Sequence, residues 1–279
     1  MIIDFHTHIV SPQIKSNRDK YIDKDRCFAI LYSDPKAKLV TADELIDSMD
    51  NEGIEISVIA NYGWSTAELC IETNDYIMES IARFPKRLFG FCAIPPNSVD
   101  DAIAEVERCI HGGIKGIGEI RPDMQLFDFR NKTVMKPFVD VLENYGLILL
   151  THSSEPVGHQ YPGKGNVTPD VLYMFINHFP DLTVVCAHWG GGLPFYSLMP
   201  EVKQKLKNVY YDTAASPFLY QPRIYTYVAQ LAGEDKILFG TDYPLMPPSR
   251  LLKEIDSLEL SDRTKDLILS GNAQRLLNI

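Results

Sequence analysis

Two histidines near the amino terminus, His6 and His8, are the first residues whose types and spacing could do chemistry. They lie in an apolar run, residues 1–10, that predicts a buried strand. Side chains two residues apart in a strand point to the same side, so the two imidazoles should project together. Such a pair is half of a metal site. The alternative is a pair of histidines that only form hydrogen bonds at a strand end.

Further candidates stand where other predicted strands end. They are Glu119 and Arg121 after the fourth strand, His152 after the fifth, His188 after the sixth and Asp242 after the eighth. Each has a structural alternative. His152 could bond a backbone carbonyl, His188 could cap a turn, and Asp242 could cap a helix. Glu119 could simply pair with Arg121.

The rest of the chain predicts how these residues are positioned. Apolar runs alternate with amphipathic segments, and this pattern of eight strands and eight helices is typical of a parallel sheet. The expected strands after the first are residues 56–60, 88–94, 114–120, 147–151, 182–187, 209–212 and 237–240. Eight such units predict an α/β fold, the (β/α)8 or TIM barrel, as a single domain over residues 1–279. A doubly wound open sheet is the alternative, but its glycine-rich turn is missing after the first strand.

In a TIM barrel, the carboxyl ends of the strands form the rim that carries the functional residues. The candidates would therefore bring four imidazoles and two carboxylates to one place. A catalytic divalent metal binds such donors and keeps one position open for water. We expect Zn²⁺ here, as one ion, or as two if Glu119 holds a second.

One connection is long enough to be a functional element. Residues 11–40 follow the first strand, and their aromatic residues favour a packed lid insertion over a disordered loop. Two other segments should complete the pocket walls. The residues expected there are Glu155, His159, Tyr161 and Lys164 after the fifth strand, and Ser216, Phe218 and Tyr220 after the seventh.

The bulk composition limits the partners. A net charge of -10 argues against nucleic acid and anionic membrane surfaces, which call for basic patches, and leaves a small-molecule substrate. The five cysteines are scattered and include no Cys-x-x-Cys pair, which predicts reduced thiols in a cytoplasmic protein. No apolar run approaches the ~20 residues of a membrane span.

Taken together, the motifs resemble the amidohydrolase superfamily, in its amidohydrolase-related branch of aminocarboxymuconate-semialdehyde decarboxylase-like enzymes. The resemblance is carried by Asp4-Phe5-His6-Thr7-His8, Thr151-His152, Ala187-His188-Trp189-Gly190-Gly191, Gly240-Thr241-Asp242-Tyr243-Pro244 and Asn272-Ala273-Gln274-Arg275-Leu276-Leu277. It implies a distorted barrel with one divalent metal.

The resemblance also implies residue roles. The metal ligands would be His6, His8, His152 and Asp242, and His188 would be a catalytic or water-orienting residue. A carboxylate at the position of Glu119 binds or bridges metal in some superfamily members, whereas the mononuclear decarboxylases manage without it. Relatives in this branch are often dimers, so a homodimer is expected by analogy alone.

Two reactions fit such a site. In hydrolysis, the metal lowers the pKa of a bound water, Asp242 moves the proton to the leaving group, and His188 bonds the water or the developing oxyanion. In non-oxidative decarboxylation of an aromatic or muconate-like acid, the metal holds the substrate and an acid delivers a proton to carbon. Because Glu119 suits hydroxide chemistry, we expect a hydrolase acting on a small ester, lactone or amide. Arg121 could grip a substrate carboxylate.

A third alternative is a non-catalytic barrel that binds a ligand and keeps its metal for structure. Structural zinc sites tend to be closed and often use cysteine ligands. None of the motif positions is a cysteine. The pattern therefore favours an enzyme.

Overall fold

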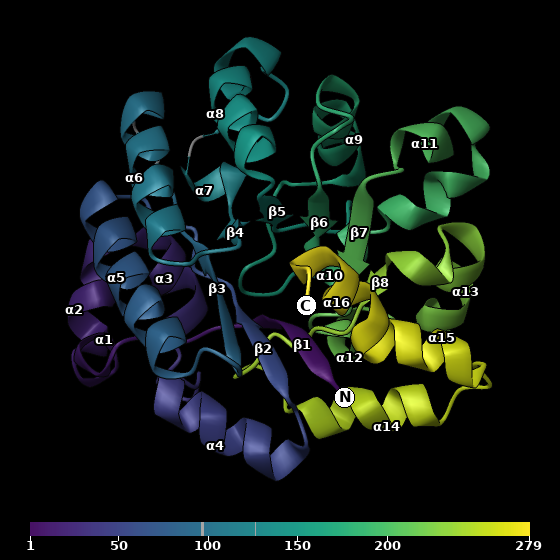
Figure 1. Cartoon of the computed structure of the whole chain (residues 1–279), viewed down its shortest axis with the longest axis horizontal. Coiled ribbons are helices and arrows are strands. Elements are labelled where there is room, and N and C mark those ends of the chain that lie inside the picture. Colours follow the sequence, from purple (N-terminus) through teal and green to yellow (C-terminus); the bar gives the residue numbers. More distant parts are fainter. Residues whose placement is uncertain (96–97, 126) are drawn as a thin grey trace.

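The computed structural model describes residues 1–95, 98–125 and 127–279, in which eight parallel strands follow one another around a barrel (Figure 1). The strands are β1 (Ile3–Thr7), β2 (Ile56–Ile59), β3 (Leu88–Cys92), β4 (Gly116–Ile120), β5 (Ile148–Thr151), β6 (Val184–Cys186), β7 (Val209–Asp212) and β8 (Ile237–Leu238). Backbone hydrogen bonds close the barrel between its first and last strands, where Phe5 N–H donates to Phe239 over 2.7 Å and Asp242 N–H donates to His6 over 2.8 Å. The predicted (β/α)8 barrel is confirmed.

Helices cover the outside of the barrel (Figure 1). The longer ones are α4 (Ala42–Glu52), α5 (Ala67–Arg83), α6 (Val99–His111), α8 (Lys132–Tyr145), α9 (Pro169–His178), α13 (Ile224–Leu231) and α14 (Pro248–Asp256). The shorter segments are α7 (Pro122–Gln125), α10 (Ala187–Gly190), η1 (Leu193–Leu198), α11 (Pro200–Lys205), α12 (Ser216–Leu219), η2 (Glu234–Lys236), α15 (Asp262–Asp266), η3 (Leu267–Gly271) and α16 (Asn272–Leu277). Among the helices of the described ranges, none combines the length and the apolar character that a bilayer crossing demands.

Residues 11–40 contain three short helices, α1 (Pro12–Ser16), α2 (Arg18–Lys24) and α3 (Arg26–Tyr32). Their apolar side chains pack with the segment that follows β2. This cluster includes Ile14, Tyr21, Phe28, Tyr32, Tyr62 and Trp64. The insertion is thus a packed helical element beside the barrel, and its action as a lid stays a prediction.

The core has two layers. One fills the inside of the barrel with side chains from alternate strand positions, namely Ile3, Phe5, Ile56, Val58, Ala60, Phe91, Ile148, Leu150, Val185, Ala187 and Leu238. Ala273 and Leu277 of α16 join this layer, and α16 lies close to the amino terminus (Figure 1). A larger layer packs the outer strand faces against the helices. The inner layer lies below the carboxyl ends of the strands and supports the rim there, where the candidate residues lie.

A bulge in β1 turns the histidine pair inward. The pairing of β1 with β2 slips by one residue between Asp4 and Thr7. Because strand side chains alternate, a slip of one residue exchanges the two faces. Phe5 therefore packs in the barrel interior, and the later His6 and His8 still face the mouth of the barrel.

A second bulge, in β4, does the same for Glu119. The pairing of β4 with β5 slips between Ile117 and Ile120, so Ile117 packs in the outer layer while Glu119 faces the mouth. Gly118 makes this path possible, since its φ is 123° and a Cβ there would lie 2.0 Å from the carbonyl oxygen of Leu150. Only glycine fits.

Asp4 ties the two closing strands together. Its buried carboxylate accepts hydrogen bonds from the backbone N–H of His6 over 3.2 Å and from Thr241, through N–H over 2.9 Å and Oγ1 over 2.6 Å. Burial raises the pKa of Asp4 to about 7, against the lowering effect of these bonds. The bonds fix the backbone that leads to Asp242.

We expect Thr241→Val, which keeps the side-chain shape, to lower the free energy of unfolding by about 1–3 kcal/mol, because it leaves a buried carboxylate one donor short. Thr133→Val, on the exposed start of α8, should change it by no more than about 0.5 kcal/mol. Urea unfolding of both variants measures the difference. Equal midpoints would show that the bond to Asp4 does not hold the barrel closed.

Candidate active site

His6 and His8 face each other at the carboxyl end of β1, with their Nε2 atoms 3.0 Å apart. The opposite nitrogen of each ring is fixed by the protein. His6 Nδ1 lies 2.8 Å from Oδ2 of Asp212, and His8 Nδ1 lies 3.0 Å from the carbonyl oxygen of Ala60. The predicted juxtaposition of the two rings is present, and both rings are buried.

The hydrogen bonds of His6 and His8 set their tautomers in a way that favours a bound cation. A carbonyl oxygen only accepts, so His8 Nδ1 carries the hydrogen that it donates to Ala60. The other carboxyl oxygen of Asp212 accepts two backbone N–H groups over 2.9 and 3.1 Å. The charge of Asp212 raises the pKa of His6, so His6 Nδ1 donates to Asp212. In the neutral rings, two Nε2 lone pairs then oppose each other. A divalent metal relieves this arrangement, and the donor set fits one.

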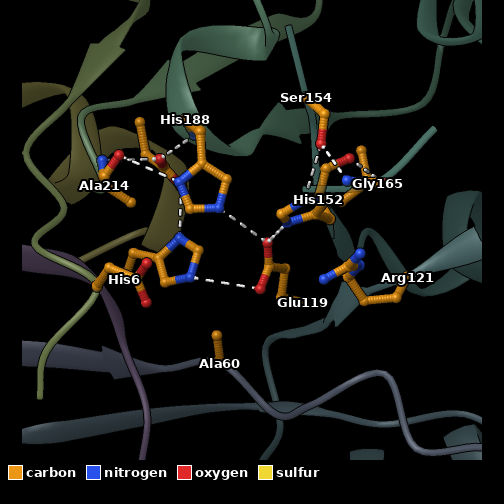
Figure 2. Close-up of polar contacts among 12 residues, drawn as sticks. His6, Ala60, Glu119, Arg121, His152, Ser154, Gly165, His188 and Ala214 are labelled. Carbon is orange, nitrogen blue, oxygen red and sulfur yellow. Dashed lines mark hydrogen bonds and ion pairs between the residues drawn. The ribbon is translucent and has the colours of Figure 1, made fainter. Parts of the chain in front are cut away.

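Glu119 lies between two pairs of imidazoles, and Figure 2 shows His6, His152 and His188 turned toward it. Its Oε2 lies 3.8 Å from Nε2 of both His6 and His8, and its Oε1 lies 2.7 Å from His152 Nδ1 and 3.3 Å from His188 Nε2. On each side of Glu119, the three candidate ligand atoms lie within 4.8 Å of one another. Burial would raise the pKa of Glu119, but the imidazoles, first of all His152, hold it well below its usual value.

His152, at the end of β5, is held in the neutral form. Its Nε2 lies 3.1 Å from the hydroxyl of Ser154, which accepts the N–H of Gly165 over 2.9 Å (Figure 2). Burial and then the positive charge of Arg121 lower the pKa of His152 to about 4, although Glu119 acts in the other direction. The ring therefore keeps a lone pair available near neutral pH.

His188 is presented by a left-handed turn after β6. All five residues 188–192 have positive φ, between 54° and 97°. Glycine accepts this conformation freely and other residues do not, which explains why three of the five are glycines. Gly191 also allows close packing, because a Cβ there would lie 2.4 Å from the carbonyl oxygen of Ser154.

The turn is anchored to β7, and this fixes the ring of His188. Its backbone N–H donates to Asp212, and its Nδ1 lies 3.1 Å from the carbonyl oxygen of Ala214, so Nδ1 carries a hydrogen and Nε2 faces Glu119 (Figure 2). Burial alone would lower the pKa of His188, but Glu119, with help from Asp242, raises it to about 9.

Asp242 follows β8 in a left-handed conformation with φ of 66°. Its Oδ1 lies 3.3 Å from His8 Nε2. The alternative role as a helix cap is wrong, since the next helix, α14, has Pro247 at its N-cap. Burial would raise the pKa of Asp242, but the neighbouring histidines, first of all His8, lower it. It is therefore an ionised carboxylate beside the histidine pair.

A cavity of about 710 Å³ opens above these residues. Its lining includes the histidines His8, His152 and His188, the carboxylates Glu119 and Asp242, and much of segment 27–38. Of the expected wall residues, His159, Tyr161 and Phe218 line the cavity, whereas Glu155, Lys164, Ser216 and Tyr220 are not among its lining residues.

Arg121 also lines the cavity, and it is 3% exposed. Its partner is Asp123, whose carboxylate accepts from Nε over 3.3 Å and from Nη2 over 3.1 Å. The alternative pairing with Glu119 is therefore wrong. Within the described residues, no protein acceptor lies in hydrogen-bond range of Nη1, so this side of the guanidinium can meet a substrate.

The structure thus brings together all six predicted residues of the rim, His6, His8, Glu119, His152, His188 and Asp242. Sequence reasoning missed the supporting residues. Asp212 orients two histidines at once, through the ring of His6 and the backbone of His188. Its place at the end of β7 was the available signal. Ser154 gave none.

Comparison with known proteins defines the class. A model of the amidohydrolase family matches residues 3–279, so the chain belongs to that family. It is 24% identical to 2-amino-3-carboxymuconate-6-semialdehyde decarboxylase of Dictyostelium discoideum, over 99% of this chain and 91% of that protein. The resemblance to this branch of the superfamily is confirmed.

Solved structures agree in fold. The 5-carboxyvanillate decarboxylase of Sphingomonas paucimobilis superposes with a TM-score of 0.83 at 17% identity, covering 100% of this chain and 99% of that one. The 5-carboxyvanillate decarboxylase of Novosphingobium aromaticivorans gives a TM-score of 0.81 at 17% identity, covering 100% and 96%. That structure contains manganese and 4-hydroxy-3-methoxy-5-nitrobenzoic acid.

These relatives correct the expected reaction. Each of the three is a decarboxylase, so the expectation of an ester, lactone or amide hydrolase is wrong. That expectation depended on reading Glu119 as a carboxylate suited to hydroxide chemistry. In the structure, Glu119 has four imidazole partners. These contacts explain why a carboxylate is present at this position, and they do not favour hydrolysis over decarboxylation.

We expect Asp212→Asn to weaken divalent metal binding about 10–100-fold. Two backbone N–H groups require the amide oxygen, so the amide nitrogen must face His6 and donate to Nδ1. His6 would then carry its hydrogen on Nε2, where the metal needs a lone pair. Titration of metal-free protein with Mn²⁺ in a calorimeter measures the change, with the exposed Asp181→Asn as the control. Equal affinities would contradict the tautomer assignment.

Proposed function

We propose that this protein is a metal-dependent, non-oxidative decarboxylase of an aromatic or muconate-like carboxylic acid. The observation that carries the proposal is the match over 99% of the chain to a decarboxylase of such an acid. The cavity supports it, because aromatic side chains, an arginine and a cluster of imidazoles line one space. An apolar wall with a few fixed polar groups suits a planar organic acid.

A divalent metal would be held by His6, His8, His152 and Asp242, with Glu119 between the two histidine pairs. When bound, it supplies positive charge that holds the substrate's oxygens and draws electron density from the ring. Nitrogen and carboxylate donors suit both Zn²⁺ and Mn²⁺, and manganese is present in the related Novosphingobium aromaticivorans structure. We propose one ion as the working state.

Arg121 would bind the substrate carboxylate. Asp123 fixes the plane of its guanidinium by two hydrogen bonds, which leaves the Nη1 side for the ligand. An arginine held in this way is preorganised, so little side-chain entropy is lost when the acid binds. The lowered pKa of Asp123, which Arg121 causes against the effect of burial, keeps this support ionised.

His188 would deliver the proton. With Nδ1 bonded to Ala214, a proton on Nε2 points toward Glu119 and the cavity. Nε2–H protonates the carbon that bears the carboxylate, the bond from that carbon to the carboxyl group breaks, and its electron pair returns to the ring as CO₂ leaves. The product gains one hydrogen at that carbon, and His188 regains a proton from solvent. Asp242 and Glu119 favour the protonated ring through their negative charges.

We expect the protein loaded with Mn²⁺ or Zn²⁺ to release CO₂ from a hydroxybenzoate or muconate-type acid and, in D₂O, to place one deuterium at the carbon that loses the carboxyl group. His188→Gln should lower kcat about 10²–10⁴-fold, because the proton donor is lost. The control is His111→Gln, which changes an exposed histidine at the end of α6, away from the cavity, and should leave kcat unchanged. Deuterium incorporation at full rate in His188→Gln would assign the donor elsewhere, and a panel of such acids without CO₂ release would refute the reaction.

We expect Arg121→Lys to raise KM about tenfold or more while kcat falls much less, since lysine keeps the charge but loses the planar pair of donors. Steady-state kinetics on the acid found above measures both constants. Arg223→Lys, on the exposed surface, should leave them unchanged. A fall in kcat with unchanged KM would place Arg121 in the chemical step instead of in substrate binding.

A further inference from the structure

Two tyrosines form a buried hydroxyl pair at the edge of the cavity. Tyr32, the last residue of α3, and Tyr62, in the segment after β2, lie with their hydroxyl oxygens 2.8 Å apart. Tyr32 is 8% exposed and Tyr62 is 4% exposed, and both line the cavity. The ring of Tyr62 stacks on the ring of His8, with centroids 4.8 Å apart and planes 18° from parallel. The pair therefore stands directly beside the proposed metal site.

The two hydroxyls leave one hydrogen to spare. Each carries one hydrogen, and one of the two is used in the bond between them. Within the described residues, neither hydroxyl has any other hydrogen-bond partner. A phenol hydroxyl ordinarily keeps its hydrogen near neutral pH, since its reference pKa is about 10. One O–H donor thus remains for whatever occupies the cavity.

Packing fixes the position of the two hydroxyl oxygens. Phe28 lies against Tyr32 at a centroid distance of 4.7 Å, and Trp64 lies against Tyr62 at 5.5 Å. Rings held on both sides cannot turn their hydroxyls away, so the donor is preorganised. It also sits near Arg121, because Gly63, the neighbour of Tyr62, packs against that side chain so closely that a Cβ would lie 2.4 Å from it.

We propose that the Tyr32 and Tyr62 pair recognises a second oxygen of the substrate, beyond the carboxylate that is lost, and so selects oxygen-substituted acids. This inference rests on the proposed function, since it assumes an acid in the cavity. The selected group is a hydroxyl or a further carboxylate, which accepts the spare hydrogen. Because Tyr32 belongs to the 11–40 insertion, that segment then contributes directly to substrate choice.

The test compares binding of benzoate with binding of 2-, 3- and 4-hydroxybenzoate to metal-loaded protein by calorimetry. We expect at least one hydroxybenzoate to bind about tenfold more tightly than benzoate, the effect of one buried hydrogen bond. The double variant Tyr32→Phe/Tyr62→Phe should reduce this ratio to near one, and each single variant should reduce it in part. Tyr21→Phe is the matched control, since Tyr21 belongs to the same insertion and its hydroxyl bonds Glu72 of α5.

A ratio is chosen because damage to the fold would weaken all four ligands together and leave it unchanged. A ratio that persists in the double variant, or no preference in the wild type, overturns the proposal. Binding does not require turnover, so the two proposals fail separately. A ratio that depends on the tyrosines without CO₂ release would refute the reaction only, and CO₂ release with an unchanged ratio would refute the tyrosine pair only.

Discussion

The opposition of two imidazole nitrogens is the constraint on which this molecule depends. His6 and His8 each have their outer nitrogen committed as a donor, to Asp212 and to the carbonyl oxygen of Ala60, so their inner nitrogens face each other 3.0 Å apart. Two lone pairs at that distance are unfavourable unless positive charge lies beside them. Burial alone would lower the pKa of His6, yet Asp212 and Glu119 raise it to about 10, so the surroundings already attract a cation. A bound metal ion would supply this positive charge without a further proton on either ring.

Holding this arrangement costs local stability, and the cost is concentrated at the rim. His188, Trp189 and Asp242 have left-handed backbones that residues other than glycine adopt only at about 1–2 kcal/mol each. Such residues persist when their surroundings hold them from several sides. Hydrogen bonds between strands do this here, since Asp4 binds the backbone before Asp242, and Asp212 binds the backbone of His188.

The sequence was enough to predict which residues lie at the ends of the strands, but it did not predict the bulges within the strands. A period of two residues was enough to place His6 beside His8, and the barrel rule was enough to gather Glu119, His152, His188 and Asp242. The bulges in β1 and β4 arise from pairing with a neighbour, and one strand alone carries no sign of that register. The three short helices of residues 11–40 were equally hidden, because helices of five to seven residues owe their stability to packing and not to local periodicity.

The residues at the strand ends could not distinguish hydrolysis from decarboxylation, for a chemical reason. Imidazoles and carboxylates around a divalent cation can serve either water activation or substrate binding, so the ligand types at the rim do not distinguish hydrolysis from decarboxylation. The difference lies in the groups that meet the rest of the substrate. The residues that we propose for this role are on loops and inserted segments, as with Arg121 after β4 and Tyr32 in α3, where sequence periodicity carries no information. The rim thus carries the features shared with the family, and under the proposed function the connecting segments select the acid that binds and the reaction that follows.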